Sequence, residues 1–460
     1  MNYQSLNPFD GRLSKSFPEH TTAEIDTALS RAEHCFRAWS QTALVERARL
    51  LERAAHLLRA RVDHFARQVT LEMGKLIGEA RGEVLLSAEI LEYYARHGAA
   101  FLAPRTLQPD QGQAHIESAP LGLIFGVQPW NFPYYQLARF AAPNLMAGNV
   151  VAVKHAACVP QCAELFEKMW LEAGAPEGAY TNLRLSHAQV DAVIDDPRVR
   201  GVALTGSVEA GRSVAARAGI NMKKSTMELG GNDAFIVLED ADLPAAVRWA
   251  VWAKMNNMGQ CCVAAKRIIV ADAVASRFLD QFQTALSQLQ AGDPLDPSTT
   301  LGPLSTEAAL HTLLDQVQRS VATGAKVVAG GHRLHRPGAF MAPTILTDIR
   351  PGNPAYREEL FGPVALFFRV KGEDEAVALA NDSDFGLGAS LFTRDVERGL
   401  RLASRIDSGM VFINHPTWTA ADLPFGGVKQ SGYGRELSDL GIREFINHKL
   451  VRVSSLGDRP

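Results

Sequence analysis

The sequence predicts an α/β protein built from two parallel-sheet domains and a small β arm. Its 460 residues exceed what one hydrophobic core usually serves, so two or three domains are expected. Two successive runs of short apolar strands alternate with helical stretches, which is the pattern of parallel α/β sheets. A polar, alternating segment precedes the first run and a short strand-like tail follows the second, as an exposed arm requires.

The N-terminal part of the chain is expected to be helical. Apolar residues recur at helical spacing through residues 21–60, which predicts helix over this whole segment. A second amphipathic helix is predicted over residues 76–101, after Gly74 and before Pro104. Residues 106–117 are polar and alternate in character, which is typical of an exposed hairpin or arm.

Two runs of apolar strands follow, and we expect them to form two α/β domains side by side. Glu228 and Cys262 fall near the start of the second domain. The tail at residues 445–454 contains a candidate strand at 450–453 that we expect to pair with the polar arm in an oligomer. The predicted strands of the two sheets are residues 123–127, 150–153, 201–204, 234–238, 267–270, 364–368 and 409–413.

Composition excludes several classes of protein. A net charge of −3 gives no reason to expect a nucleic-acid partner. No apolar run approaches the roughly 20 residues of a membrane-spanning helix, and the first residues lack the layout of a secretion signal. Five cysteines without disulfide spacing favour a reducing, cytoplasmic location. Cys158 and Cys162 lack a second pair of ligands, so we expect them to pack in a core or on a helix face and expect no metal.

Three segments carry the chemistry. Cys262 ends the run Gly-Gln-Cys-Cys, Glu228 precedes the pair Gly230-Gly231, and Asn131 lies in Gln-Pro-Trp-Asn-Phe-Pro. A cysteine thiolate is a nucleophile, a carboxylate can act as general base for water, and a side-chain amide can stabilise an oxyanion. The sequence therefore predicts covalent catalysis through Cys262.

Each of these residues also has a simpler interpretation. A free cysteine is usually a small buried hydrophobe, and this remains our reading of Cys261, with a redox contact to Cys262 as the alternative. Glu228 could be a solvated surface acid, and Asn131 could cap the helix that follows it. The three segments in this order favour catalysis.

A glycine-containing turn predicts a phosphate site. Gly206, Ser207 and Gly211 follow an apolar strand and open a helix, where backbone N–H groups can meet a pyrophosphate. The spacing is not the common dinucleotide fingerprint, so the turn alone is weak evidence.

Together these segments resemble the signature of the aldehyde dehydrogenase superfamily, over nearly the whole chain. Further matching blocks lie at residues 358–364 and 424–432. The resemblance implies an aldehyde dehydrogenase-like α/β fold with a Rossmann-like NAD(P)-binding domain, an α/β catalytic domain and a small β oligomerisation arm. In residue numbers, these are 1–100 with 119–229, then 230–431, and then 101–118 with 444–460.

The resemblance also implies a reaction. The Cys262 thiolate adds to an aldehyde, and the oxyanion is held by the Asn131 amide and the Cys262 backbone N–H. Loss of hydride leaves a thioester, which water activated by Glu228 hydrolyses to the acid. It further implies a homodimer or homotetramer. The residues that it assigns to cofactor contacts are Trp130, Lys154, Gly206, Ser207, Gly211, Glu359 and Phe361.

The cofactor is expected to be NAD or NADP. Lys154 matches the family lysine at the adenosine ribose, and strict NAD users often carry a glutamate three residues later. Here Ala157 stands at that position, so no carboxylate repels a 2′-phosphate and NADP stays open. Glu436 matches a family acid near a proton exit route, and a structural salt bridge is equally compatible with its sequence context.

The substrate is expected to be succinate semialdehyde, which bacterial members most similar to this chain oxidise to succinate. Arg139, on a helix predicted at residues 135–146, is placed where such members bind a distal carboxylate. An internal salt bridge is the alternative for Arg139. A second arginine of some members is replaced by Asn256, and residues 415–422 match the variable loop at the substrate mouth. Other small aldehydes such as glutarate semialdehyde, acyl transfer to coenzyme A and a non-catalytic role remain alternatives.

Overall fold

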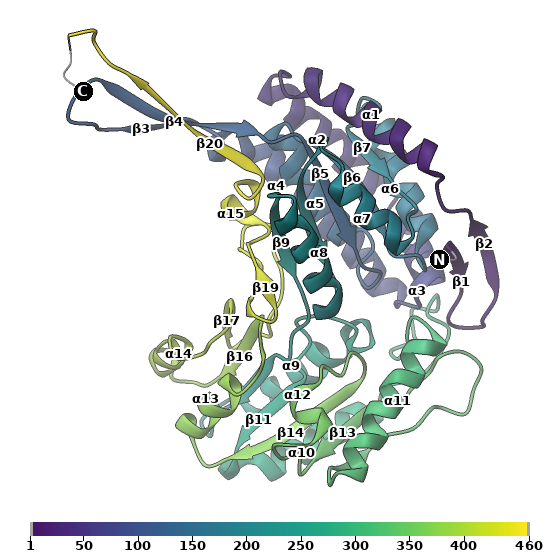
Figure 1. Ribbon diagram of the computed structural model, residues 1–460. Coiled ribbons are helices and arrows are strands. Elements are labelled where there is room, and N and C mark those ends of the chain that lie inside the picture. Colours follow the sequence, from purple (N-terminus) through teal and green to yellow (C-terminus); the bar gives the residue numbers. More distant parts are fainter. Residues whose placement is uncertain (1–2, 458–460) are drawn as a thin grey trace.

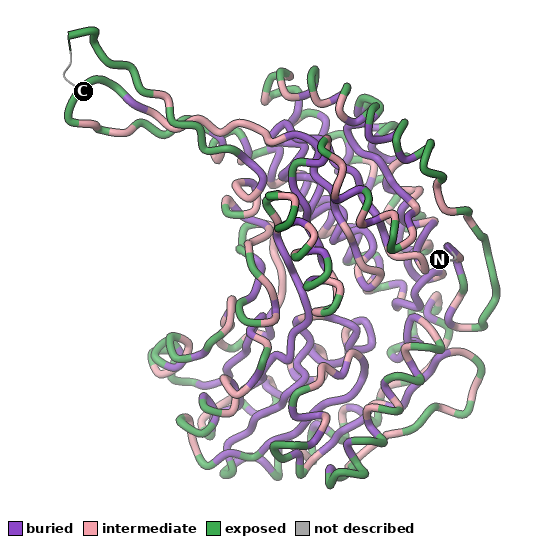
Figure 2. Tube along the Cα trace, viewed as in Figure 1, coloured by how far each residue is buried: buried purple, intermediate pink, exposed green. Residues whose placement is uncertain are grey.

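The computed structural model describes residues 3–457 of the chain. Figure 1 shows an upper body from the first half of the sequence, a lower body mostly from the second half, and a long β arm that points away from both. In Figure 2 the buried residues fill the interior of both bodies, whereas the arm is mostly exposed or half-buried. The predicted α/β fold is therefore confirmed.

The N-terminal helices cover one side of the upper body (Figure 1). Their buried residues, Leu29, Leu51 and Val84 among them, belong to the same hydrophobic core as the strands of the upper sheet. A short hairpin precedes the helices. The elements are β1 (Tyr3–Leu6), β2 (Leu13–Phe17), α1 (Thr22–Trp39), α2 (Leu44–Ala60), α3 (Val62–Met73) and α4 (Ile77–Phe101).

The helix predicted over residues 21–60 is present as two helices, because the chain breaks between α1 and α2. Ala43 has an extended backbone at φ −58° and ψ 142°, which no helix interior accommodates. Arg47 fixes the break, since its guanidinium donates to the carbonyl oxygens of Ser40 at 2.8 Å and Met146 at 3.3 Å. The apolar spacing continues through the break because both helices present their apolar residues to one core.

The upper sheet has six strands in the order β19-β9-β8-β5-β6-β7 and is parallel except at β19. Its strands are β5 (Leu123–Gln128), β6 (Val150–His155), β7 (Tyr180–Asn182), β8 (Val199–Thr205), β9 (Lys224–Glu228) and β19 (Gly432–Tyr433). The helices that connect them are α5 (Tyr135–Ala147), α6 (Pro160–Glu172), α7 (His187–Asp195) and α8 (Val208–Ile220).

The lower sheet has seven strands in the order β12-β13-β14-β11-β10-β16-β17, and β12 alone of these seven runs antiparallel to its neighbour. Its strands are β10 (Ala234–Val237), β11 (Arg267–Ala271), β12 (Lys326–Ala329), β13 (Thr344–Thr347), β14 (Val364–Val370), β16 (Gly388–Phe392) and β17 (Met410–Ile413). Its helices are α9 (Leu243–Met255), α10 (Asp272–Ser287), α11 (Glu307–Ala322), α12 (Pro354–Arg357), α13 (Glu373–Asn381) and α14 (Val396–Ala403).

The arm is a three-stranded antiparallel sheet in the order β20-β4-β3. It comprises β3 (Arg105–Leu107), β4 (Gln113–Pro120) and β20 (Ile446–Val453), which follows α15 (Ser438–Ile442). The expectation that the tail pairs with the polar arm between subunits needs correction. Within one chain β20 already pairs with the whole of β4, from Ile446 opposite Pro120 to Val453 opposite Gln113.

All seven predicted strands are confirmed, as are the helix at residues 76–101 and the hairpin of the arm. The predicted domain boundaries stay a prediction, although strand β19 shows that the chain returns to the upper sheet after residue 431. A further small ladder pairs β15 (Phe385–Gly386) with β18 (Val428–Lys429). Among residues 3–457, no helix is long and apolar enough to cross a membrane.

Candidate active site

Three segments bring Asn131, Glu228 and Cys262 to the wall of one cavity of about 300 Å³. Asn131 follows β5, Glu228 ends β9, and Cys262 lies between the 3₁₀ helix η1 (Asn256–Gly259) and β11. Because the strands of the upper sheet are parallel, their carboxyl ends meet at one edge, where such sheets bind ligands. Eight residues predicted from the sequence line this cavity: Trp130, Asn131, Gly206, Ser207, Glu228, Cys262, Glu359 and Phe361.

Cys262 is the half-buried thiol on the cavity wall, whereas Cys261 is buried. The buried Lys266 fixes the backbone of both cysteines, because its Nζ donates to the carbonyl oxygens of Cys261 at 2.8 Å and Cys262 at 2.5 Å. A hydrogen bond with Cys261, burial and the neighbouring Glu228 carboxylate raise the pKa of Cys262 well above its usual range. The thiol therefore needs a proton acceptor before it can act as a nucleophile.

The side-chain amide of Asn131 is held in a defined orientation. Its Nδ2 lies 3.0 Å from the carbonyl oxygen of Gln260, which can only accept, so this atom is the nitrogen. Asn131 Oδ1 consequently faces Gln136, and because an amide oxygen can only accept, Gln136 Nε2 donates to it at 2.9 Å. Because an amide nitrogen carries two N–H groups, Asn131 keeps one donor for a ligand in the cavity.

Glu228 is a buried carboxylate at the end of β9. Burial raises its pKa to about 7, and the nearby Glu436 adds to this effect, whereas the Arg139 guanidinium opposes it. Glu228 Oε1 is buried without a hydrogen-bond partner among residues 3–457. A carboxyl group with a pKa near neutral pH and an unused oxygen has the properties of a general base.

Arg139 lies beside this carboxylate. It is buried, lies 3.4 Å from Glu228 Oε2 and 2.6 Å from Glu436 Oε2, and donates to the hydroxyl oxygens of Tyr135 and Thr205 at 3.0 Å each. The contact with Glu436 has the distance of an ion pair but not the angle of a hydrogen bond. This environment matches the internal salt bridge that was the alternative for Arg139, although its Nε remains a buried donor without a partner in the described chain.

A second, smaller cavity of about 20 Å³ adjoins the same thiol. Phe132, Tyr135, Trp418 and Phe425 line it, together with Arg139. Its present volume holds about one water molecule, so an aldehyde needs the surrounding side chains to move.

The predicted mouth loop contributes two of its residues to this second cavity. Trp418 and Thr419 line it, and Trp418 packs between Phe132 and Trp252, at ring-centroid distances of 6.4 Å and 4.8 Å. Thr417 does not line the cavity and instead donates its backbone N–H to Ser390 Oγ at 2.9 Å.

The glycine turn lies at the N-terminus of α8. Ser207 caps this helix, since its Oγ accepts from the backbone N–H of Ala210 at 3.2 Å. Gly211 does not line the cavity and instead allows close packing, because a Cβ there would lie 2.5 Å from the Leu229 side chain. The positive end of the helix dipole and the open cavity beside Gly206 suit an anionic ligand.

Glu359 and Phe361 close the other wall of the large cavity. Glu359 accepts from the Gly231 N–H at 3.1 Å and pairs with Lys266 at 2.8 Å, and a Cβ at Gly230 would clash with its carboxylate. The rings of Phe361 and Trp130 meet edge to face at 6.0 Å. Lys154 is buried at the end of β6 but is not part of the cavity lining.

The structure also shows residues that the sequence did not single out. Gln136 lines both cavities, Thr205 lines the larger one beside Glu228, and Lys266 joins the cysteine backbone to Glu359. Thr205 directly precedes Gly206, so its place in the phosphate turn was a usable signal. Gln136 and Lys266 act through tertiary contacts that no local pattern indicates.

Comparisons with known proteins agree with this geometry. Residues 1–451 match the aldehyde dehydrogenase family. A succinate-semialdehyde dehydrogenase [NADP(+)] of Deinococcus radiodurans is 51% identical over 458 residues, which cover 100% of this chain and 96% of that protein. A succinate-semialdehyde dehydrogenase [NADP(+)] 1 of Mycobacterium bovis is 45% identical over 99% of this chain and 100% of its own length. The crystal structure of succinic semialdehyde dehydrogenase from Streptococcus pyogenes with NADP+ superposes with a TM-score of 0.97 at 42% identity, covering 98% of this chain and 100% of that one. This chain belongs to the aldehyde dehydrogenase family.

Proposed function

We propose that this chain oxidises succinate semialdehyde to succinate with NADP or NAD. The observation that carries the proposal is the meeting of Cys262, Glu228 and Asn131 on one cavity wall. The names of the two relatives that are 51% and 45% identical support the substrate and the use of NADP.

The reaction begins at the Cys262 thiol. Because its pKa is raised, the thiol must lose its proton as it attacks, and water in the open cavity is the acceptor that we assign. The thiolate then forms a bond to the aldehyde carbon, and the carbonyl oxygen becomes an oxyanion. The free N–H of Asn131 Nδ2 and the backbone N–H of Cys262 are the donors that we assign to this oxyanion. Loss of one such donor costs about 10²–10³ in kcat in other enzymes.

Glu228 acts when the acid is released. The nicotinamide, when bound, accepts the hydride that leaves the aldehyde carbon. The product of that oxidation is a thioester on Cys262, and water must attack it. The unpartnered Glu228 Oε1 can take the proton from this water, and the Cys262 thiolate leaves as the C–S bond breaks.

The residues of the larger cavity fit a dinucleotide. Gly206 and Ser207 offer the N-terminus of α8 to the pyrophosphate, and Trp130, Glu359 and Phe361 frame the space at Cys262 where the nicotinamide would lie. Lys154 and Gly211 do not line the cavity. We assign Lys154 to the adenosine ribose of the cofactor, and Gly211 allows the close packing of α8 that positions the phosphate turn. We infer that residues 1–100 and 119–229 form the cofactor domain and that residues 230–431 form the catalytic domain.

The distal carboxylate of the substrate belongs in the smaller cavity. Arg139 lines it, and its unpartnered Nε can donate to a carboxylate oxygen. The Arg139 guanidinium already faces the carboxylates of Glu228 and Glu436. Binding of the substrate carboxylate beside them therefore favours protonation of either Glu228 or Glu436. Arg139 in this proposal contacts the substrate and also positions the general base.

We further propose that the chain assembles as a homodimer or homotetramer through the arm, and that it works in the cytoplasm. The arm supports the first proposal, because it carries apolar side chains on a sheet that the rest of the chain leaves largely uncovered. Five cysteines without a disulfide among residues 3–457 support the second.

One assay tests the function. Purified protein is mixed with succinate semialdehyde, glutarate semialdehyde or butanal, each with NADP or NAD, and absorbance of the reduced nicotinamide is followed. The expected result is the highest kcat/KM for succinate semialdehyde. A preference for butanal would overturn the assignment of a carboxylate-bearing substrate, and no reaction with any pair would overturn the dehydrogenase itself.

A further inference from the structure

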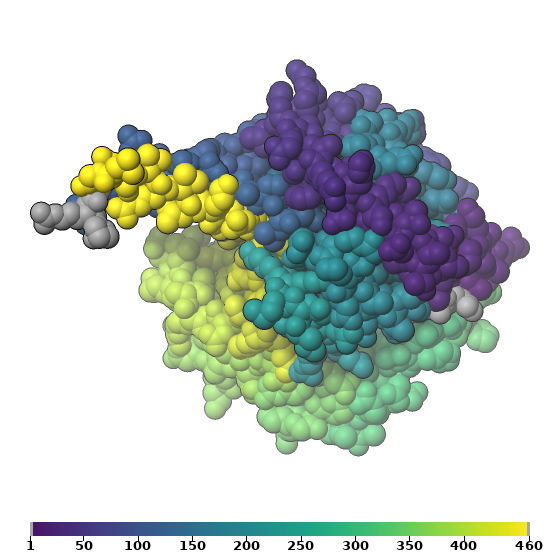
Figure 3. Space-filling model, turned by 45° about the horizontal axis from the view of Figure 1, so that its top comes forward, coloured from purple at the N-terminus to yellow at the C-terminus, as the bar shows by residue number. Residues whose placement is uncertain are grey.

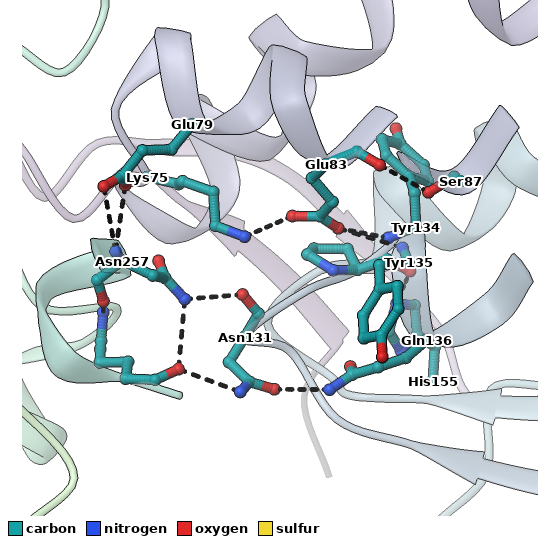
Figure 4. A network of polar contacts seen from close by, with 12 residues as sticks. Lys75, Glu79, Glu83, Ser87, Asn131, Tyr134, Tyr135, Gln136, His155 and Asn257 are labelled. Atoms are coloured by element: carbon teal, nitrogen blue, oxygen red, sulfur yellow. Dashed lines mark hydrogen bonds and ion pairs between the residues drawn. The ribbon is translucent and has the colours of Figure 1, made fainter. Parts of the chain in front are cut away.

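Helix α4 carries two carboxylates that the proposed mechanism does not use, although both contact the segments that form the site. Glu79 and Glu83 are one helical turn apart, and Lys75 lies in the loop just before the helix. In Figure 4, Glu79 points toward Asn257, whereas Glu83 points toward Lys75 and the backbone of Tyr134 and Tyr135. This is unusual for acidic side chains on a helix, which are ordinarily solvated.

Glu83 forms a buried junction with the start of α5. It makes an ion pair with Lys75, and both side chains are almost completely buried. Its Oε1 also accepts from the backbone N–H groups of Tyr134 at 2.8 Å and Tyr135 at 3.3 Å. No side chain of α5 caps that helix itself, so a carboxylate from another helix satisfies its N-terminal donors.

Lys75 extends this junction to the residue next to the oxyanion donor. Its ammonium lies 3.6 Å from the ring centroid of Phe132, which directly follows Asn131 and lines the smaller cavity. The charge of Lys75 therefore contacts Glu83 on one side and the Asn131 segment on the other.

Glu79 holds the segment that leads to the nucleophile. Both of its carboxylate oxygens accept from the backbone N–H of Asn257, at 3.2 Å each. Asn257 and Met258 have φ angles of 50° and 57°, in the left-handed region that non-glycine residues rarely adopt. Two consecutive strained residues so close to Cys262 persist only where their surroundings hold them.

Asn257 joins the two segments. Its Nδ2 donates to the carbonyl oxygen of Asn131 at 2.8 Å and to that of Gln260 at 3.2 Å. Asn131 in turn donates from its own Nδ2 to the same Gln260 carbonyl at 3.0 Å. In Figure 4 these contacts form a closed ring between the Asn131 segment and the 256–260 segment.

We propose that Glu79 and the Lys75–Glu83 ion pair are positioning residues, which hold the Asn131 amide and the Cys262 backbone in register for oxyanion binding. The proposal rests on the proposed function, because it assigns the oxyanion to these two donors. Helix α4 anchors both segments that form the ring. Glu83 binds the start of α5, just after Asn131, and Glu79 binds Asn257. A shift of about 1 Å in such donors costs as much as about 10²-fold in rate.

The test is a double-mutant cycle in the full-length protein. Glu79→Gln and Glu83→Gln are each made alone and in an Asn131→Ala background, and kcat, KM and cofactor affinity are measured. Each single variant should lower kcat by about 10-fold or more while cofactor affinity changes less than twofold. In the Asn131→Ala background the same changes should lower kcat by a clearly smaller factor, because one of the two donors that they position is already gone.

A matched control lies on the same helix. Glu92 pairs with Arg59 at the surface, at 2.7 Å and 2.8 Å, so Glu92→Gln removes a paired carboxylate from α4 without touching the ring. This variant should keep wild-type kcat. Losses of equal factor with and without Asn131 would overturn the proposal and leave Glu79 and Glu83 as residues of stability alone.

A second measurement separates this proposal from the proposed function. The rate of alkylation of Cys262 by iodoacetamide, followed by peptide mass, should rise at least threefold in Glu79→Gln, because the 256–260 segment loses its anchor. This readout needs no aldehyde oxidation, so it stands even if the wild-type protein oxidises no aldehyde. It also needs only Glu79→Gln, should Glu83→Gln fail to fold. An unchanged alkylation rate in folded Glu79→Gln contradicts the proposal.

Discussion

At the level of single residues, the two adjacent cysteines differ in what they face. Cys262 lines both cavities, whereas Cys261 lines the smaller one from a buried position. We expect Cys262→Ala to abolish aldehyde oxidation and to leave cofactor affinity within about twofold, since a thiol-to-methyl change leaves the phosphate turn intact. Cys261→Ala should retain most activity. Steady-state rates and cofactor titration of both variants check this, and equal losses would reverse the assignment of the nucleophile.

The same pair makes a prediction about pH. The hydrogen bond with Cys261 is the first cause that raises the pKa of Cys262. Removing it in Cys261→Ala should lower the pKa of Cys262, so the thiolate should form at lower pH. The pH dependence of iodoacetamide alkylation at Cys262 measures this directly. An unmoved or upward-shifted profile would contradict the proposed effect of Cys261.

The titration of Glu228 determines how the rate falls at low pH. Its pKa is raised to about 7, so the carboxylate that accepts protons is depleted as pH falls through 7 and is fully present only above it. Hydrolysis of the thioester should therefore slow below neutral pH. The charge of Glu436 contributes to the raised pKa of Glu228, so Glu436→Gln should move the fall in rate to lower pH.

Two measurements check the role of Glu228. The pH profiles of kcat in wild type and Glu436→Gln give the pH at which the rate falls in each protein. Glu228→Gln should give a burst of reduced cofactor followed by slow turnover, with the acyl group trapped on Cys262 and visible by mass spectrometry. Absence of both burst and trapped acyl group would assign Glu228 to an earlier step, the deprotonation of Cys262.

Arg139 combines two roles that kinetics can separate. Loss of its contact with Glu228 should slow the oxidation of every aldehyde, and loss of a carboxylate contact should affect succinate semialdehyde alone. A hydrogen bond to a charged group is worth about 1.5–3 kcal/mol, which is roughly 10- to 150-fold. We expect kcat/KM of Arg139→Leu to fall more for succinate semialdehyde than for butanal by about that factor. Parallel losses would leave Arg139 as a positioning residue for Glu228 only.

At the level of elements, the sequence predicts what is locally encoded. Buried parallel strands such as β5, β6 and β14 are apolar over most of their length, which makes them predictable from the sequence. Strand β9 has the sequence Lys-Ser-Thr-Met-Glu, and its polar residues do not predict a strand. It is a strand because it pairs with β8. The break between α1 and α2 also has no local signal, since Arg47 fixes it through contacts to Ser40 and Met146.

The candidate site shows the same division. Asn131, Glu228 and Cys262 come from short motifs, and the structure brings them together on one cavity wall. Their supports lie far away in sequence, and side chains such as Glu79 and Lys266 contribute through contacts that no spacing reveals. For Arg139, the sequence predicts an arginine near the site but not the two carboxylates that face it.

The turn between β6 and α6 provides a test at this level. Ala157 is half-buried in that turn, three residues after Lys154, and offers no carboxylate to a ligand. Ala157→Glu should weaken NADP binding far more than NAD binding, because a carboxylate would face a phosphate that carries up to two negative charges. Fluorescence titration with both dinucleotides measures the two affinities, and NAD serves as the internal control. Unchanged NADP affinity would show that the adenosine ribose binds elsewhere.

At the level of the whole molecule, the arm is the feature that one chain does not explain. Figure 3 shows it projecting from the body, with β20 on its visible face. Leu450 and Val453 on β20 are each 60% exposed, although both are apolar. A small three-stranded sheet that leaves apolar side chains exposed has little stability of its own, so another surface is expected to cover it.

A partner copy of this chain is the cover that we expect. Light scattering should give two or four times the chain mass of 50.0 kDa. A charged side chain in a covered apolar surface is costly, so Leu450→Asp with Val453→Asp should shift the protein toward smaller species. Leu13→Asp is the matched control, because Leu13 is 54% exposed on β2, which Figure 1 shows on the opposite side of the molecule from the arm, and should not change the mass. A wild-type protein that is monomeric at every concentration, or an arm variant with unchanged mass, would rule out assembly through this surface.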